Sequence, residues 1–396
     1  MLKLKPLQRS LAALALCAVV PLGAMAQKKD PVQVGLVTSK SGQFAQQGEE
    51  VLRAIQFAID EANAKGGVDG REVKVQIADD EGTPDAGRRV AEKLARDGHN
   101  LLIGAIPSSI SMAIAQNLER WDAVYFGTLS KSDKMTGDSC KARSFRTNHS
   151  DAMDLAMIGE WMKSFKEQNY AVIASDYVWG RDSGESFVKK ATALGKKADL
   201  SLYVPMGTKD FSPYIAQLKA SNAQAVWVAI VGRDGIAFVK QAQEFGLIGP
   251  KRLLGHALIF QYVADATGKA TEGTWGNIGY GAEIDNPRNK AFVQAFKAKF
   301  NRVPTENEGA AYNGVQVMFE GVKKAGSVKP ADVAKALRGA TLDTVYGQTT
   351  MRAEDNQLLI PNYVGVVKAD GGKLRPVIQQ TFPATLAPAP SPDCKL

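Results

Sequence analysis

Apolar and polar positions follow two alternating patterns along the first third of this chain. The segment VQVGLVTS, residues 32–39, is a short and mostly apolar run that is typical of a buried strand. A long stretch follows in which apolar residues recur at helical spacing, so that one face of a predicted helix carries Val51, Ile55, Ala58, Ile59 and Ala62. The glycines at 66 and 67 end this helix. Val73, Val75 and Ile77 then alternate with polar residues as the next strand.

The same order of elements continues to about residue 130. Thr83 and Pro84 fit the cap and first position of a helix that runs to about Arg96. Further strands are predicted over 101–105 and 123–126, with a helix from 108 to 119 between them. Strands that alternate with helices in this way predict a parallel sheet with helices on both faces.

The pattern starts again after about Thr147. It predicts strands over 171–174, 200–204, 225–230 and 252–254. One predicted helix begins at 151, a second ends at about 194, and two more span 211–219 and 235–245. Helices over 289–300 and 309–324 follow, then two strand-like segments, LLIPNYVGVVKA and KLRPVIQQ, and a Pro-rich tail over 382–396 that we expect to be extended. The predicted fold class is therefore α/β, with two doubly wound parallel-sheet lobes, and 396 residues suffice for two domains.

The N-terminus carries the features of a secretory signal peptide. Three basic residues precede the apolar run LAALALCAVV (residues 11–20), and Ala24-Met25-Ala26 fits the cleavage site. The run is shorter than the ~20 residues of a membrane-spanning helix. We expect a soluble exported protein that begins at Gln27, with residues 1–26 removed and the periplasm as its compartment.

Charge and cysteine usage exclude other classes of protein. The formal net charge of +8 comes from Lys and Arg residues scattered among Asp and Glu, which does not favour nucleic-acid binding. Cys140 and Cys394 remain after cleavage, without CxxC spacing and with only three histidines in the chain, so we expect no metal site. In an oxidising compartment the two cysteines are expected to form a disulfide that ties the tail to the first lobe; two free thiols are the alternative.

Four segments make the chain resemble a known family. These are SGQFAQQGEE, EANAKGGVDGREVKVQIADDEGTPDAG, LLIGAIPSS and LDTVYGQTTMRAEDNQ, which begin at residues 41, 61, 101 and 342. They are similar, in the same order, to the leucine/isoleucine/valine-binding class of periplasmic solute receptors (type I periplasmic binding proteins). The resemblance implies a monomeric receptor without cofactor that binds a small carboxylate ligand between two lobes and serves an inner-membrane ATP-binding-cassette permease.

The resemblance also implies where the lobes divide. Three crossovers join them, so that residues 30–147 and 277–344 form lobe one, and residues 148–276 and 345–381 form lobe two. Closure of lobe two onto a ligand already bound to lobe one is the expected motion.

Candidate ligand contacts in lobe one follow the carboxyl ends of its strands. Ser41 and Phe44 lie after the first strand, where a helix cap is the alternative interpretation. Ser108 and Ser109 begin a helix after the third strand, where backbone N–H groups favour a carboxylate, although one serine can simply cap. The resemblance adds the turn after the fourth strand, with Thr128, Leu129 and Ser130.

In lobe two, Trp179 is the main candidate. It follows the strand over 171–174, and in similar receptors an aromatic residue before a glycine covers the ligand; a half-buried surface tryptophan is the alternative. Further expected contacts come from the turns after the next two strands, with Arg233 and Asp234 in one, and His256 and Ala257 in the other. The resemblance also places Tyr312 near the cleft, although a helical aromatic is more often part of a core.

One departure from the resemblance concerns the ligand. Amino-acid receptors of this class carry an acidic side chain near residues 255–257 to pair with the ligand ammonium, and this chain has Gly255-His256-Ala257 there. A buried ammonium without a counter-charge is costly. An apolar or aromatic carboxylate is therefore at least as well supported as leucine or valine, unless Asp234 supplies the charge.

Two other functions have less support in the sequence than a solute receptor. A secreted α/β hydrolase would need an activated nucleophile, and the chain has no G-x-S-x-G motif, P-loop or H-E-x-x-H motif. A ligand-sensing receptor for a signalling partner shares the fold, but would need a separate membrane protein to transmit the signal. We therefore expect a receptor and not an enzyme.

Overall fold

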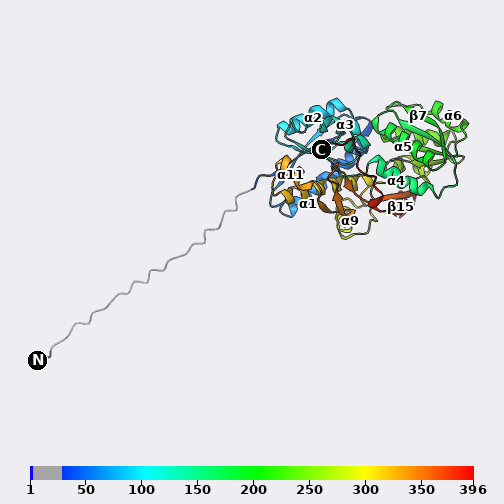
Figure 1. The fold of residues 1–396 in the computed structure, drawn as a ribbon. Helices are drawn as coiled ribbons and strands as arrows, with labels where there is room; N and C mark the ends of the chain where they lie inside the picture. Colours follow the sequence, from blue (N-terminus) through cyan, green and yellow to red (C-terminus); the bar gives the residue numbers. More distant parts are fainter. Residues whose placement is uncertain (3–28) are drawn as a thin grey trace.

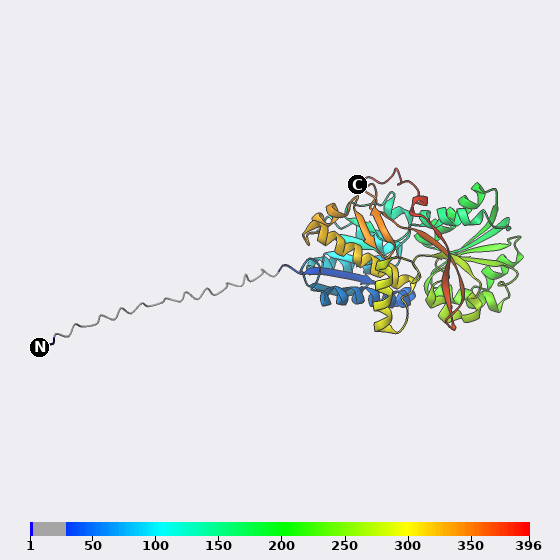
Figure 2. The same ribbon diagram turned by 90° about the horizontal axis from the view of Figure 1, so that it is seen from below.

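The computed structural model describes residues 1–2 and 29–396. The predicted cleavage site after Ala26 and most of the predicted signal peptide lie outside these residues. In the described part of the chain, no helix combines the length and the hydropathy that crossing a membrane requires. The elements form two lobes that lie side by side, each built on its own sheet (Figures 1 and 2).

The first lobe is built on a five-stranded parallel sheet in the order β2-β1-β3-β4-β5. Its strands are β1 (Val32–Thr38), β2 (Val73–Asp79), β3 (Leu101–Gly104), β4 (Val124–Gly127) and β5 (Ser144–Arg146). The helices of this lobe are α1 (Ala45–Ala64), α2 (Pro84–Arg96), α3 (Ser108–Ala115), α9 (Pro287–Phe300), α10 (Glu306–Ala325) and α11 (Pro330–Leu337), together with the short 3₁₀ turns η1 (Gly42–Phe44) and η2 (Asp133–Thr136). Thr83 caps α2 and Pro84 begins it, as the sequence predicted.

The second lobe is built on a seven-stranded sheet in the order β15-β14-β10-β9-β8-β6-β7. Its strands are β6 (Asn169–Ser175), β7 (Lys197–Val204), β8 (Ala225–Ala229), β9 (Arg252–Gly255), β10 (Trp275–Ile278), β14 (Asn362–Asp370) and β15 (Lys373–Phe382). The first five are parallel to one another, whereas β14 and β15 join antiparallel. The helices are α4 (Asp151–Met162), α5 (Val178–Ala193), α6 (Ser212–Ala220), α7 (Gly232–Glu244) and α8 (Gln261–Thr267), with the 3₁₀ turn η3 (Gly268–Thr271). The α/β class and the two wound sheets agree with the prediction.

The chain passes between the two sheets at three places that lie close together. These crossovers follow β5, β10 and a small antiparallel sheet of β11 (Thr341–Thr344), β12 (Gly347–Met351) and β13 (Leu358–Leu359). The Nε2 atom of His149 lies 2.7 Å from the carbonyl oxygen of Pro361, and the hydroxyl of Tyr346 donates to the carbonyl of Gly279. β10 extends to Ile278, and β12 and β13 pair with β11. The predicted division of the lobes at 276/277 and 344/345 remains a prediction. Which segments move together as rigid lobes remains a proposal.

The predicted disulfide between Cys140 and Cys394 is confirmed, with the two Cα atoms 5.5 Å apart. Cys140 lies in the first lobe, between η2 and β5. The tail leaves the second lobe at the end of β15, forms the short 3₁₀ turn η4 (Ala384–Leu386) and passes over to the first lobe, as Figure 2 shows.

Candidate functional site

The candidate site is a cavity of about 50 Å³ between the two lobes. Both lobes contribute side chains that follow the carboxyl ends of their strands, as expected for ligand sites of open α/β sheets. The first lobe provides Gln47, Ile106, Ser108, Leu129, Lys131 and Asn307, and the second provides Tyr177, Trp179, Val231, Ala257 and Phe260. Most of these side chains are apolar or aromatic, so the cavity favours a ligand with an apolar body.

Ser108 offers a hydroxyl hydrogen to this cavity. It is the first residue of α3, and its Oγ accepts the backbone N–H groups of Lys131 (3.2 Å) and Ser132 (3.1 Å). Both lone pairs of the oxygen are therefore occupied, so the O–H is left to act as a donor. The N-terminus of an α-helix also favours negative charge. This end of the cavity is suited to a carboxylate.

Lys131 brings a positive charge to the same end of the cavity. Its Nζ forms an ion pair with Oδ2 of Asp154 at 2.5 Å, and the two side chains are 10% and 1% exposed. Burial opposes ionisation of Asp154, but the charge of Lys131 and a hydrogen bond from His256 outweigh it and lower the pKa of this carboxyl. The pair also joins the lobes, since Lys131 follows β4 and Asp154 lies on α4.

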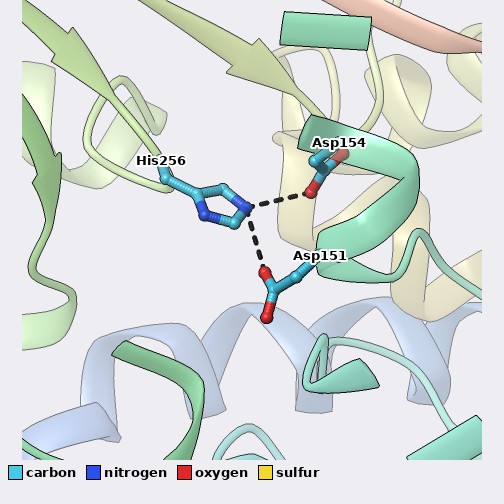
Figure 3. A group of neighbouring side chains, drawn as sticks. All are labelled: Asp151, Asp154 and His256. Atoms are coloured by element: carbon cyan, nitrogen blue, oxygen red, sulfur yellow. Dashed lines mark hydrogen bonds and ion pairs between the residues drawn. The ribbon is translucent and has the colours of Figure 1, made fainter. Parts of the chain in front are cut away.

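His256 lies behind the cavity wall, where it holds Asp154 (Figure 3). The indole N–H of Trp227 donates to Oγ of Ser183, and this Oγ lies 2.7 Å from Nδ1 of His256. The Nε2 atom faces Oδ2 of Asp154 at 3.0 Å, which requires a proton on Nε2 when Asp154 is ionised. Burial lowers the pKa of His256, so the ring is neutral with Nδ1 as acceptor.

Asp151 is the buried acid that the sequence did not identify as part of the site. It is the first residue of α4, and its Oδ1 accepts the indole N–H of Trp179 at 3.0 Å. Its Oδ2 has no hydrogen-bond partner among the described residues and points away from His256 in Figure 3. Burial, together with the charges of Asp133 and Asp154, raises the pKa of Asp151 well above its usual value. A positively charged group that reached Oδ2 would favour the ionised form.

Asp151, Asp154 and His256 have the composition of a metal site, since their ligand atoms lie within 4.8 Å of one another. However, the ammonium of Lys131 already lies against Asp154, and the proton on Nε2 of His256 points at the carboxylates. The arrangement is that of an ion pair supported by hydrogen bonds. The prediction that the chain carries no metal site remains a prediction.

Trp179 lines the cavity from the first turn of α5 and is 4% exposed. Its ring packs against Tyr177 and His256, with centroids 5.9 Å and 5.2 Å apart. The residue after Trp179 must be glycine for steric reasons, because a Cβ on Gly180 would lie 2.0 Å from the carbonyl oxygen of Ser175. The tight turn between β6 and α5 therefore requires glycine at 180, and the indole just before it lines the cavity.

The predicted contacts divide into three groups in the structure. Ser108, Leu129, Trp179 and Ala257 line the cavity. Buried behind it lie Thr128, Ser130 and His256; Ser130, for example, bonds to Ser111 and to two carbonyls of its own lobe. The remaining predicted contacts, which do not line the cavity, are Ser41, Phe44, Ser109, Arg233, Asp234 and Tyr312.

Two members of the last group have other partners. The carboxylate of Asp234 accepts the backbone N–H of Gly207 at 2.8 Å. Tyr312 stacks on Phe292 with ring centroids 3.8 Å apart, and its hydroxyl donates to Glu61. Tyr312 is thus a core aromatic of the first lobe, where α10 packs on α1 and α9, and the alternative interpretation of this residue applies.

A second cavity of about 270 Å³ lies next to the first. Its lining includes Glu50 and Glu306, both buried acids of the first lobe. The side-chain amide of Asn307, which lines the first cavity, donates to Oε2 of Glu50 at 2.7 Å. This hydrogen bond forms part of the wall between the two cavities.

Comparisons with known proteins agree with this geometry. The family model described as periplasmic binding protein matches residues 31–373. The Leu/Ile/Val-binding protein homolog 1 of Brucella suis biovar 1 is 30% identical over 359 residues, which cover 88% of this chain and 93% of the relative. A Leu/Ile/Val-binding protein homolog 4 of Brucella melitensis biotype 1 is 26% identical and covers 90% of both chains.

Solved structures share the fold. The solute-binding protein of an ABC transporter from Rhodopseudomonas palustris BisB5, in complex with 3,4-dihydroxybenzoic acid, superposes with a TM-score of 0.82 at 24% identity, over 89% of this chain and 97% of that one. A leucine-, isoleucine-, valine-, threonine- and alanine-binding protein from Brucella ovis in its closed conformation gives a TM-score of 0.82 at 23% identity, over 92% and 98%. The family model spans both lobes and the cavity between them, and the chain belongs to the periplasmic binding protein family.

Proposed function

We propose that this protein is a periplasmic solute receptor that closes around a small carboxylate ligand and delivers it to an inner-membrane ATP-binding-cassette permease. The observation that carries this proposal is the cavity between the lobes, where Ser108 and Lys131 offer donors and a positive charge beside an apolar wall. As a receptor it would act as a monomer, without cofactor and without catalysing a reaction. Export by the predicted signal peptide would place it in the periplasm, with Gln27 as the first residue of the mature chain.

Within this function we favour a ligand that carries an amine. No acid lies near Gly255 in the sequence to pair with an ammonium, but Asp151 supplies one from a different element. Its Oδ1 holds the indole N–H of Trp179, while its Oδ2 has no hydrogen-bond partner in the part of the chain that the structure describes. An ammonium that reached Oδ2 would find a buried carboxylate able to ionise. The relatives named for leucine, isoleucine and valine are in keeping with this choice.

An aromatic carboxylate without an amine is the second candidate. Tyr177, Trp179 and Phe260 give the cavity an aromatic wall, and the similar fold from Rhodopseudomonas palustris is in complex with a dihydroxybenzoic acid. With such a ligand Asp151 would stay protonated and keep its bond to Trp179. The cavity of about 50 Å³ must widen for either ligand.

Titration calorimetry with paired compounds separates the two candidates. The pairs are L-leucine with 4-methylpentanoate and L-phenylalanine with 3-phenylpropanoate, and 4-hydroxybenzoate is measured beside them. We expect the amino acid of a pair to bind more tightly, and Asp151→Asn to remove this advantage. Asp234→Asn is the matched control, because Asp234 is also a buried acid at the start of a helix, but its carboxylate accepts the N–H of Gly207. Tighter binding of the amine-free compounds would instead establish the aromatic or apolar carboxylate.

A further inference from the structure

The C-terminal segment, residues 383–394, runs from the second lobe to the first. It begins at the end of β15, which pairs with β14 in the seven-stranded sheet, and it ends at the disulfide with Cys140 (Figure 2). Cys140 lies just before β5, the edge strand of the five-stranded sheet. The two ends of the C-terminal segment are therefore fixed to different lobes.

Hydrogen bonds as well as the disulfide attach the far end of the C-terminal segment to the first lobe. The guanidinium of Arg352 donates to the carbonyl of Pro388 at 2.6 Å and is itself held by two hydrogen bonds to Asp355. The neighbouring Asn356 donates its side-chain amide to carbonyls of the Cys140–β5 loop and of β5 itself, at Lys141, Ala142 and Ser144. The turn between β12 and β13 thus belongs to the first lobe and provides a second attachment point.

The part between the lobes is short and stiff. Only residues 383–387 lie between the end of β15 and the attachment at Pro388, and they contain the 3₁₀ turn η4, which packs against α4. Prolines occupy positions 383, 388, 390 and 392. Each proline fixes its own φ and restricts the residue before it, so the segment cannot lengthen freely.

The three crossovers do not supply this kind of restraint. His149 in the first crossover bonds to Pro361 in the third, and Tyr346, in the turn between β11 and β12, bonds to Gly279 in the second and packs on His149, so the three crossovers lie together in one hinge region. A body attached at one hinge can rotate about it in several directions. A second attachment away from the hinge removes some of these rotations.

We propose that the disulfide-bonded C-terminal segment is a fourth connection between the lobes, which limits how far they separate. The cavity then opens over a restricted range, and the receptor spends less time in widely open forms. This role goes beyond ligand binding and does not depend on which ligand the cavity accepts.

Two variants of the full mature chain test the proposal without any ligand. The first is Cys140→Ser/Cys394→Ser, which frees the end of the segment. The second replaces residues 383–389 by a site-specific protease sequence of the same length; cutting it leaves the rest of the tail bonded to Cys140. Its matched control is the same variant before cutting. The readouts are the radius of gyration from small-angle X-ray scattering and hydrogen exchange at Asp151 and Ala152, whose N–H groups bond to Lys131 and Asp133 across the lobes.

The expected result is the same for both ways of releasing the segment. The radius of gyration increases, and Asp151 and Ala152 exchange severalfold faster, while amides within β3 and β8 keep their rates. Unchanged scattering and exchange after cutting would overturn the proposal. An effect of the serine variant that cutting does not reproduce would also overturn the proposal, because the disulfide would then act only within the first lobe. If the serine variant does not fold, the cut variant decides alone.

Discussion

At the scale of single residues, the site depends on polar groups buried just behind an apolar wall. The indole of Trp179 faces the cavity while its N–H is held by Asp151, so the ring is fixed in position before a ligand arrives. An aromatic anchor that is already ordered loses little side-chain entropy on binding.

Trp179→Ala is therefore expected to weaken ligand binding by about 1 to 3 kcal/mol, the loss typical of a buried aromatic anchor. Titration calorimetry measures the affinity, and ligand should also change the fluorescence of the wild type. Trp161→Phe is the control, because Trp161 packs on Trp275 away from the cavity. An unchanged affinity in Trp179→Ala would show that the indole packs in the protein interior without contributing to binding.

The buried pair of Lys131 and Asp154 permits a prediction about stability. Lys131→Met removes the ammonium beside the buried Asp154 and leaves the hydrogen bond from the neutral His256, which should lower the free energy of unfolding by about 3 to 5 kcal/mol. Urea unfolding followed by circular dichroism measures the loss. The double variant Lys131→Met/Asp154→Asn should recover much of it, since no charge is left unpaired. Equal losses in the single and the double variant would argue against the ion pair as the cause.

The sequence predicted the positions of the elements far better than the positions of side chains. Ser108, Trp179 and Ala257 could be placed near the cavity because parallel strands bring their carboxyl ends to one edge, and the family resemblance added Leu129. Asp151 and Asp154 could not, because acids in the first turn of a helix usually face water and stabilise the helix dipole. Their burial depends on how α4 lies against Lys131 and His256. Tyr312 was expected near the cleft but packs on Phe292, because helical spacing does not show which neighbours an aromatic side chain contacts.

At the scale of elements, the turn between β6 and α5 is the most constrained part of the site. Gly180→Ala places a Cβ against the carbonyl of Ser175 and should destabilise the protein by about 1 to 3 kcal/mol, although alanine normally favours a helix over glycine. Thermal unfolding measures the effect. Gly279→Ala is a matched control, because nothing lies within 4 Å of a Cβ there. A stabilising effect of Gly180→Ala would show that the turn relaxes without cost.

At the scale of the whole molecule, two buried acids give stability a pH dependence in an unusual direction. Burial raises the pKa of Glu50 to about 7 and that of Glu306 to about 8. Both groups keep a proton in the folded state that the unfolded state releases near its usual value of 4.5. Their contribution to stability is therefore present at low pH and is lost as the pH rises toward their folded values.

Buried histidines act in the opposite direction, but only at lower pH. Burial lowers the pKa of His149 to about 4. Its contribution makes the free energy of unfolding rise with pH only up to about pH 6.5, where an unfolded histidine loses its proton. Between about pH 6.5 and pH 8 the free energy of unfolding should decrease by up to ~1.4 kcal/mol per pH unit for each acid that is still protonated. Urea unfolding across this range measures the slope, and Glu306→Gln should reduce it. A slope that is flat or positive in the wild type would contradict the assigned protonation.

The hydrogen bond from Asn307 to Glu50 separates a space of about 50 Å³ from one of about 270 Å³. In the proposed receptor this hydrogen bond would limit the length of the solute, while Ser108 and Trp179 would hold its other parts. A substitution at position 307 would then change the space open to the solute and leave both of those residues in place. The range of solutes that fit and the way in which they are held would then depend on different residues.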